Sequence, residues 1–287
     1  MTRRIKGLSE VIGNYGALLV DLWGCVHNGV EPYPAAIDAL EHAAIAGVSV
    51  CLLSNGPRRV PVIIERLEEM GVPRSCYHHT MTSGEATWQA LAHPSDAWHR
   101  ALGRNCYHLG PERDNSVREN AGLIMVDRLE DADFIVNTGA YRNEDPLSDY
   151  ESTLTEAAAL NLPMVCANPD LIVHVGDQLS ICAGLLAERY EALGGNVAYH
   201  GKPHPSVYAM CFEKLGNPMP SRVLGIGDAI RTDVAGAKAA GCDALFLAHG
   251  IYKDGFGTDD PEPSAVEAKA AEEGHLAPEY VLPELRW

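Results

Sequence analysis

The sequence predicts an α/β protein built on a doubly wound parallel sheet that is interrupted by a second, inserted domain. Two stretches, one near each end of the chain, alternate continuous apolar runs with helical patterns. Continuous apolar runs are typical of parallel strands that helices cover on both faces, and their alternation with helices is typical of a doubly wound sheet. The same pattern resumes after a separate set of elements, so an insertion is more economical than two domains in tandem.

The predicted elements follow in order along the chain. Glycine is common just beyond the last turn of a helix, and Gly47 and Gly71 fit that position. The first stretch contains a strand at 16–20, a helix at 34–46, a strand at 48–53 and a helix at 58–70. The last stretch contains a strand at 222–226, a helix at 233–241 and a strand at 243–250. Between them lie the strand-like segments CYHLG, DADFIVNTG and PMVCANPD and a helix near 148–160.

The chain of 287 residues is long enough for two units with proper cores. We therefore expect a core domain from residues 1–84 and 193–287, with an inserted cap domain at 85–192. The acidic stretch from Asp254 to Glu273 is expected to be a solvated surface segment.

Composition excludes several classes of protein. The formal charge of −17 leaves no basic surplus to neutralise phosphates, which argues against a nucleic-acid partner. No apolar stretch is long enough for a membrane span, and none before Gly13 is long enough for a signal sequence. The eight cysteines form no CxxC pair and are expected to be free thiols. We expect a cytoplasmic protein with no membrane partner.

Polar residues stand where the predicted strands end. Asp21 follows the apolar run ALLV, where an aspartate either attacks a phosphorus centre as a nucleophile or simply caps a turn. Ser54 and Asn55 follow the strand VSVCLL, where they either form a phosphate cradle or cap a helix. Ligands of doubly wound sheets bind beyond the carboxyl ends of the strands, so these side chains are expected on one rim.

Two further segments complete the pattern. Lys202 lies between Gly201 and Pro203, where a fixed point charge suits phosphate oxygens and an attacking carboxylate. Asp228 and Asp233 lie in GIGDAIRTD, directly after an apolar run. Carboxylates of this kind, with Asp21 as a third, suit Mg²⁺.

The order of these motifs resembles the haloacid dehalogenase (HAD) superfamily of hydrolases. The likeness is to subfamily IIA, the branch with a large α/β (C2-type) cap that includes NagD and the 4-nitrophenyl and pyridoxal phosphate phosphatases. The four motifs are matched, in part or fully, by DLWGCVHNG, LLSNGPRR, GKPHPSVY and GIGDAIRTDVAGA. Segments SGEATWQAL, ANPD and CAGLLAERYEALGG are similar to the cap side of that branch.

This resemblance implies a Rossmann-like core, a mobile cap and a Mg²⁺ cofactor. Asp21 would be the nucleophile and a metal ligand, and Trp23 would offer its backbone carbonyl to the metal. Asp228 would be the main carboxylate ligand, with Asp233 in support. Homodimers that form through the cap occur in this branch, so a homodimer is possible here by analogy.

The resemblance also assigns the substrate-binding residues. Ser54, Asn55 and Lys202 would hold the phosphoryl group, and Asn168 and Asp170 in the cap would face the leaving group and set specificity. The segment ANPD is alternatively a simple turn in which Asp170 caps a helix. The implied activity is that of a HAD-type phosphatase, a Mg²⁺-dependent hydrolase of a small phosphorylated metabolite such as a sugar phosphate or nucleotide, through an aspartyl-phosphate.

Trp23 departs from the family pattern, which has a proton-donating aspartate at this position. An indole nitrogen donates a hydrogen bond but does not titrate, and losing general acid and base help costs a factor of roughly 10² to 10⁴. His27 is one possible substitute, although a plain structural role is the favoured interpretation of this residue. The alternatives are a metal-independent haloacid dehalogenase-like hydrolase, since that class carries an aromatic residue here, and a catalytically weak metabolite-binding protein.

Overall fold

The structure is a computed structural model that describes residues 1–175, 178–252, 255–256 and 260–287. The chain forms two compact units. The first unit contains Met1–Ser54, Ile64–Met81 and Lys202–Trp287, and the second contains Asn55–Ile63 and Thr82–Gly201. The domain division expected from the motifs stays a prediction. Among the described residues, no helix is both long and apolar enough to cross a membrane, and all eight cysteines are free.

The first unit is built on a seven-stranded sheet with the order β1-β14-β13-β12-β2-β3-β4. Its strands are β1 (Arg3–Arg4), β2 (Ala17–Val20), β3 (Ser49–Ser54), β4 (His79–Thr82), β12 (Val223–Gly227), β13 (Asp243–Leu247) and β14 (Tyr280–Leu282). Its helices are α1 (Pro34–Ile45), α2 (Val60–Glu69), α7 (Pro205–Lys214), α8 (Ala235–Ala239) and α9 (Pro263–Glu272). The first four residues of α2 and Thr82, the last residue of β4, belong to the second unit.

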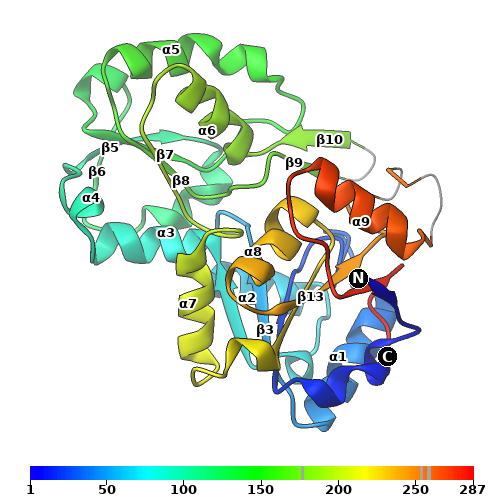
Figure 1. The fold of residues 1–287 in the computed structure, drawn as a ribbon. Helices are drawn as coiled ribbons and strands as arrows, with labels where there is room; N and C mark the ends of the chain where they lie inside the picture. The colour runs from blue at the N-terminus through cyan, green and yellow to red at the C-terminus, as the bar shows by residue number, and fades with distance from the viewer. Residues whose placement is uncertain (176–177, 253–254, 257–259) are drawn as a thin grey trace. The chain divides into compact units, whose positions relative to one another are not determined.

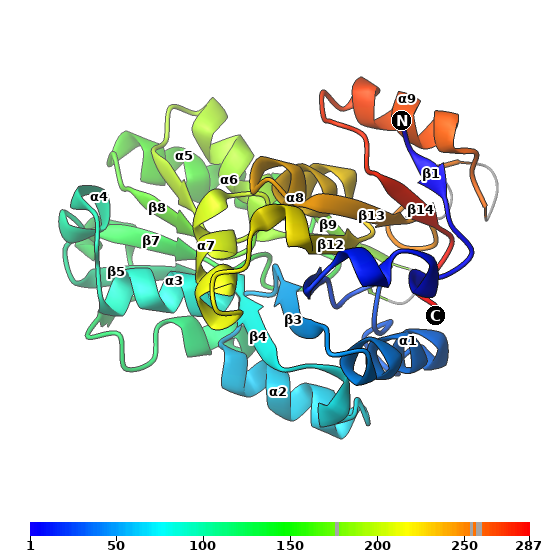
Figure 2. The same ribbon diagram turned by 60° about the horizontal axis from the view of Figure 1, so that its bottom comes forward.

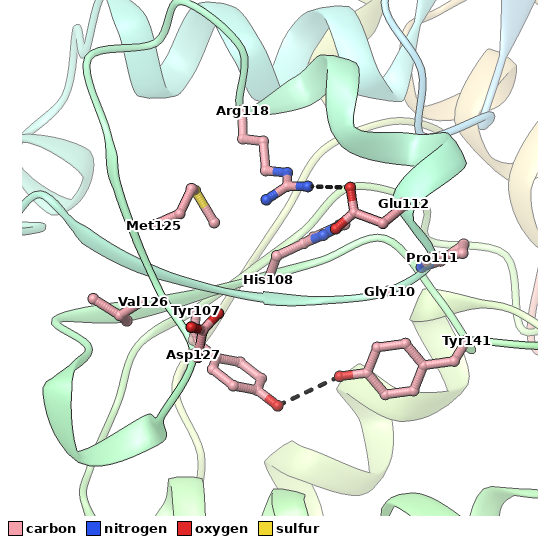
Figure 3. A pocket seen from close by; sticks show the side chains of 10 residues that line it. All are labelled: Tyr107, His108, Gly110, Pro111, Glu112, Arg118, Met125, Val126, Asp127 and Tyr141. Atoms are coloured by element: carbon pink, nitrogen blue, oxygen red, sulfur yellow. Dashed lines mark hydrogen bonds and ion pairs between the residues drawn. The ribbon is translucent and has the colours of Figure 1, made fainter.

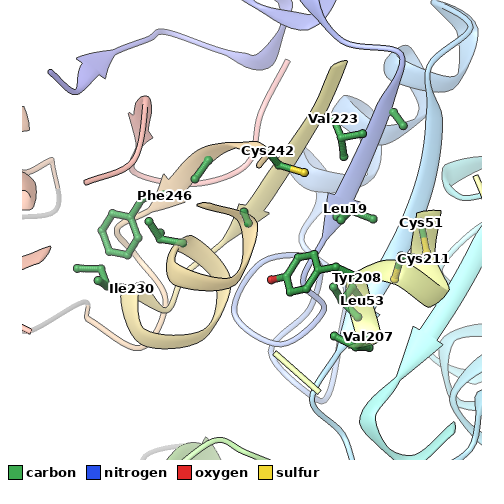
Figure 4. Close-up of a cluster of buried hydrophobic side chains, with 14 of the residues drawn as sticks. Leu19, Cys51, Leu53, Val207, Tyr208, Cys211, Val223, Ile230, Cys242 and Phe246 are labelled. Carbon is green, nitrogen blue, oxygen red and sulfur yellow. The ribbon is translucent and has the colours of Figure 1, made fainter. Parts of the chain in front are cut away.

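Both faces of this sheet are covered, which explains the continuous apolar runs. Alternate strand residues such as Leu19 and Leu53 pack with Tyr208 of α7 in one buried cluster (Figure 4). That cluster also includes side chains from α8 and α9, and Figure 2 shows α1 on the opposite side of the strands. Central strand β2 pairs in parallel with β3 and with β12, so these three strands end along one edge.

The second unit has its own parallel sheet, with the order β11-β8-β7-β5-β6, and a separate antiparallel pair of strands, β9 and β10 (Figure 1). The strands are β5 (Asn105–Leu109), β6 (Ile124–Val126), β7 (Phe134–Asn137), β8 (Met164–Cys166), β9 (Ile172–Val175), β10 (Gln178–Ile181) and β11 (Val197–Tyr199). The helices are α3 (Ser83–Ala92), α4 (Ala97–Arg100), α5 (Glu151–Ala159) and α6 (Ala183–Ala192).

Neighbouring residues of β7 show that this second sheet is also covered on both faces. Ile135 packs in a cluster with residues of α5 and α6, whereas Phe134 and Val136 pack in another with partly buried side chains of α3 and α4. Successive strand residues point to opposite faces. A strand that is buried on both sides therefore reads as an unbroken apolar run.

The predicted strands and helices of both stretches are present, and the predicted doubly wound α/β fold is confirmed. Two boundaries were wrong. The segment predicted as a helix at 233–241 is a π-helical turn, Ile230–Val234, followed by α8, and the strand predicted at 243–250 ends at Leu247.

The acidic stretch was also misread as only solvated surface. Residues 254 and 257–259 lie outside the described residues, but α9 buries Val266 and Ala270 completely. These two residues are four apart, so they lie on one face of the helix. The four-residue spacing of these apolar residues indicated a helix with one buried face, but the many acidic residues around them outweighed it in the prediction.

Candidate active site

The parallel register of the first unit brings two predicted acids to the same edge of the sheet. Val20 pairs with Ile226 on the neighbouring strand. Asp21 comes directly after Val20 and Asp228 two residues after Ile226, so both acids lie just beyond this pair at the carboxyl ends of their strands. The backbone N–H of Asp21 donates to the Ile226 carbonyl at 2.9 Å, which continues the ladder one residue beyond β2. Ser54 is the last residue of β3, the neighbour of β2 on its other side.

Lys202 joins this group from outside the sheet. Its Nζ donates to Asp21 Oδ1 at 2.5 Å and to Asp233 Oδ1 at 2.6 Å. All three residues are buried, with exposed fractions of 3% for Lys202, 8% for Asp21 and 7% for Asp233. The structure therefore brings four predicted site residues of the first unit together: Asp21, Lys202, Asp228 and Asp233.

The buried carboxylates outnumber the buried ammonium group. Burial and the nearby charges of Asp21 and Asp233 raise the pKa of Asp228 well above its ordinary value. Burial likewise raises the pKa of Asp233 to about 6, although Lys202 opposes the rise. A cluster with three acids and one lysine has an excess of negative charge, which a bound cation would balance.

The donor set fits a hard divalent cation. Ligand atoms of Asp21, Asp228 and Cys25 all lie within 4.8 Å of one another. Carboxylate oxygens are the ligands that Mg²⁺ prefers. The thiol of Cys25 is not of that kind, because burial and the charge of Asp228 raise its pKa well above the ordinary value and keep it protonated.

Cys25 is a member of this cluster that sequence reasoning missed. It is 1% exposed and follows Asp21 by four residues. No spacing rule marks a lone cysteine in a turn as part of a metal site. Only the fold of the turn shows that it lies against the acids.

Two glycines make room for the carboxylate of Asp228. A Cβ atom added to Gly24 would lie 2.2 Å from Asp228 Oδ2, and one added to Gly250 would lie 1.8 Å from it. Gly24 also has φ +81, a conformation that other residues rarely adopt. Asp228 is fixed further by the backbone N–H of Ile251, which donates to Oδ2 at 2.8 Å.

Trp23 and His27 pack against each other in the turn that follows β2. Their rings meet edge to face with centroids 5.5 Å apart, and the Trp23 ring also covers Gly29. The His27 Nδ1 accepts a hydrogen bond from the Gly29 N–H at 3.0 Å. Burial, with the charge of Arg66, lowers the pKa of His27 to about 4, so the ring is neutral at pH 7.

The remaining predicted residues lie in the second unit. Asn55 Nδ2 donates to Asp170 Oδ1 at 2.8 Å, and Ser83 Oγ donates to Asn55 Oδ1 at 3.1 Å. Asn168 Oδ1 accepts from the Asp170 N–H at 3.1 Å, which is the side-chain hydrogen bond of a turn. The predicted phosphate-binding Asn55 and the predicted specificity residue Asp170 are thus direct partners.

Two arginines that sequence reasoning did not single out fix the segment after Asn55. Arg58 Nε donates to Asp114 Oδ1 at 2.6 Å. Arg59 forms a two-pronged pair with Glu85 at 3.0 and 3.1 Å and lies 3.5 Å from the centre of the Trp88 ring. Bidentate pairs of this kind are geometrically specific, so they hold the Asn55–Ile63 stretch to the rest of the second unit.

The second unit also contains a pocket of about 420 Å³ near the carboxyl ends of β5 and β6. Figure 3 shows Arg118 and Met125 on one side of β5 and Tyr107 with Tyr141 on the other. Arg118 is paired with Glu112 at 2.8 Å. None of the predicted site residues lines this pocket.

A lysine-bridged set of carboxylates beyond the strand ends of a doubly wound parallel sheet suits a hydrolase that works by phosphoryl transfer. Two family models match the chain: the haloacid dehalogenase-like hydrolases over residues 18–124, and a second HAD hydrolase-like model over 199–286. The chain is also similar to a solved haloacid dehalogenase-like hydrolase from Brucella suis 1330, with 34% identity and a TM-score of 0.80, covering 86% of this chain and 94% of that one. The chain belongs to the haloacid dehalogenase-like hydrolases.

Two further relatives agree with this assignment. The 5'-nucleotidase YutF of Bacillus subtilis (strain 168) is 26% identical over 253 residues, which cover 86% of this chain and 93% of that protein. Glycerol phosphate phosphatase Rv1692 from Mycobacterium tuberculosis, solved in complex with magnesium, is similar in fold, with 23% identity, a TM-score of 0.64, and coverage of 84% and 70% of the two chains. The predicted subfamily IIA and the predicted class, a HAD-type phosphatase, are confirmed.

Proposed function

We propose that this protein is a Mg²⁺-dependent hydrolase of a small phosphorylated metabolite, such as a sugar phosphate or a nucleotide, that acts through an aspartyl-phosphate on Asp21. The observation that carries this proposal is the Lys202 ammonium, which contacts both Asp21 and Asp233 inside a buried group of acids. A lysine in this position reduces the electrostatic repulsion between an anionic substrate and the anionic nucleophile.

In the proposed reaction, a carboxylate oxygen of Asp21 attacks phosphorus and the bond from phosphorus to the leaving oxygen breaks. Water then hydrolyses the acyl phosphate, which releases inorganic phosphate and restores the carboxylate. Asp21, Asp228, Asp233 and the carbonyl of Trp23 would hold Mg²⁺. The bound ion would add positive charge beside the phosphoryl oxygens, and the magnesium in the related glycerol phosphate phosphatase supports this choice of metal.

The other assignments concern the substrate. We propose that Ser54, Asn55 and Lys202 bind the phosphoryl group and that Asn168 and Asp170 contact the leaving group. The hydrogen bond from Asn55 to Asp170 supports a link between phosphoryl binding and leaving-group recognition, because it joins a proposed phosphate-binding residue to a proposed specificity residue. A homodimer, a cytoplasmic location and the absence of nucleic-acid and membrane partners remain proposals.

Neither residue considered as a proton donor for the leaving group is well suited to that role. Trp23 does not titrate. Two observations count against His27, the substitute considered from the sequence: its Nδ1 already accepts from the Gly29 N–H, and its ring is neutral at pH 7. A neutral imidazole is a weak acid. A substrate with a good leaving group needs little help from either residue.

The test is phosphate release from a panel of sugar phosphates, nucleotides, pyridoxal phosphate, acetyl phosphate and 4-nitrophenyl phosphate, with Mg²⁺ and with EDTA. We expect turnover that requires Mg²⁺, that Asp21→Asn abolishes, and that Asp38→Asn on the exposed face of α1 leaves unchanged. Equal activity of Asp21→Asn and wild type would remove the nucleophile from the proposal. Chloride release from a 2-haloacid in EDTA would favour the dehalogenase, and saturable binding of a panel member without turnover would favour a metabolite-binding protein.

A further inference from the structure

Two histidines that are far apart in the sequence meet inside the second unit. His99 belongs to α4 and His200 follows β11, and their Nε2 atoms lie 3.0 Å apart. The ring centroids are 5.0 Å apart. Only about a tenth of each is exposed, with 9% for the His99 side chain and 8% for His200. Neither residue belongs to a motif of the proposed active site.

An aspartate fixes the orientation of one ring. Asp96 Oδ2 lies 2.7 Å from His99 Nδ1, and Asp96 Oδ1 accepts from the His99 backbone N–H at 2.9 Å as the N-cap of α4. The carboxylate keeps a proton on Nδ1, so the neutral ring carries its lone pair on Nε2. That lone pair faces His200.

We propose that His99 and His200 bind one borderline divalent transition-metal ion, represented by Zn²⁺, with water completing its coordination. Zn²⁺ binds imidazole nitrogen at about 2.0–2.1 Å, and two nitrogens 3.0 Å apart lie within reach of a single ion. A carboxylate on the far nitrogen of a ligating histidine is the usual partner of such a site, because it orients the ring and raises its basicity.

The binding step is balanced by one proton. Without metal, His200 Nε2–H donates to His99 Nε2, so a proton lies between the two nitrogens. When a metal ion binds, it replaces this proton between the two nitrogens, and the proton moves to Nδ1 of His200 or to solvent. The ion therefore substitutes for an existing link and connects α4 to the last residues of the second unit.

This site differs in chemistry from the carboxylate cluster of the first unit. Hard Mg²⁺ prefers oxygen, whereas imidazole suits Zn²⁺, Cu²⁺ and Ni²⁺. Copper makes the two sites distinguishable, because Cu²⁺ held by two imidazoles shows nitrogen hyperfine coupling and Cu²⁺ held by Asp21, Asp228 and Cys25 does not.

The experiment is Zn²⁺ calorimetry and Cu²⁺ electron paramagnetic resonance on the full chain, with Mg²⁺ in excess and with Asp228→Asn as the background that weakens the other cluster. We expect two-nitrogen coupling for wild type, its loss in His99→Gln and in His200→Gln, and unchanged binding in the control His93→Gln. Asp96→Asn preserves the N-cap and should weaken Zn²⁺ binding by roughly 10- to 100-fold.

Because His200→Gln lies in a buried position, circular dichroism must show that each variant is folded, and His99→Gln on the short α4 serves as the second test. If the pair is only a hydrogen-bonded pair of imidazoles, wild type and His99→Gln will bind Zn²⁺ equally and show the same copper spectrum. Either result overturns the proposal without affecting the proposed phosphatase, which is measured with Mg²⁺ alone.

Discussion

Replacing Lys202 by methionine and Asp21 by asparagine should separate stability from activity at the candidate active site. Both residues are proposed to be essential, so both variants should lose turnover. Their effects on folding should differ, because Lys202 supplies the positive charge of the buried cluster and Asp21 supplies part of its negative excess.

The magnitudes follow from the charges that each variant leaves behind. Lys202→Met leaves three buried carboxylates without their ammonium partner, and removing one partner of a buried ion pair costs about 3–5 kcal/mol. Asp21→Asn leaves two carboxylates with one lysine, and it relieves the repulsion that contributes to the raised pKa values of Asp228 and Asp233. We expect its free energy of unfolding to lie within about 1 kcal/mol of wild type or above it.

The assay is chemical denaturation of all three proteins in EDTA and again in excess Mg²⁺, followed by circular dichroism. A bound cation compensates part of the missing ammonium charge, so Mg²⁺ should stabilise Lys202→Met more than wild type. Lys202→Leu serves as a second apolar variant and guards against a packing effect specific to methionine. The reasoning is refuted if Asp21→Asn is destabilised as much as Lys202→Met in EDTA.

Three further predictions concern single residues. Gly24→Ala should raise the Mg²⁺ concentration needed for half-maximal turnover by roughly 10- to 100-fold, because the new methyl group meets the carboxylate of Asp228. An unchanged Mg²⁺ titration would contradict this. His27→Gln should change turnover by less than roughly tenfold, whereas loss of a true general acid costs roughly 10² to 10⁴, so a larger loss in a folded variant would assign the proton donor to His27. Burial lowers the pKa of His108 from 6.5 to about 4. Above pH 6.5 the imidazole is neutral in both the folded and the unfolded chain, but as the pH falls towards 4 only the unfolded chain binds a proton. The free energy of unfolding therefore falls over this range, by about 3 kcal/mol in all. Urea unfolding should therefore lose less stability between pH 7 and pH 4 in His108→Gln than in wild type, and parallel losses would argue against this.

The sequence was sufficient for the parts of the fold that depend on periodicity. The strands at 17–20 and 49–54 were predictable because both faces of the sheet are covered, and the meeting of Asp21 with Asp228 followed because parallel strands end together. Strand β1 was not predictable, since Arg3 and Arg4 are exposed and carry no apolar pattern, and they join the sheet by backbone pairing with β14.

The site was less predictable where it depends on turns and on contacts between distant segments. Cys25 reaches the acids through the fold of one turn, and the Asn55 to Asp170 hydrogen bond joins segments 115 residues apart. The same holds for the two histidines, which are 101 residues apart. No local pattern encodes such a contact, because each partner alone looks like a cap or a turn residue.

Trp23 connects the structural result to the choice of substrate. The sequence identified it as the residue that replaces a proton donor, and the structure gives it a packing task, with its ring against His27 and over Gly29. The thiol of Cys25 is held protonated by its raised pKa, and the pKa of His27 is lowered to about 4, so neither group is matched to proton transfer at pH 7. The leaving group must then depart with little help from these residues, and we expect acyl and aryl phosphates to be turned over faster than alkyl phosphates. The substrate panel therefore measures leaving-group dependence as well as identity, and a steep dependence is the kinetic signature that a tryptophan at this position should produce.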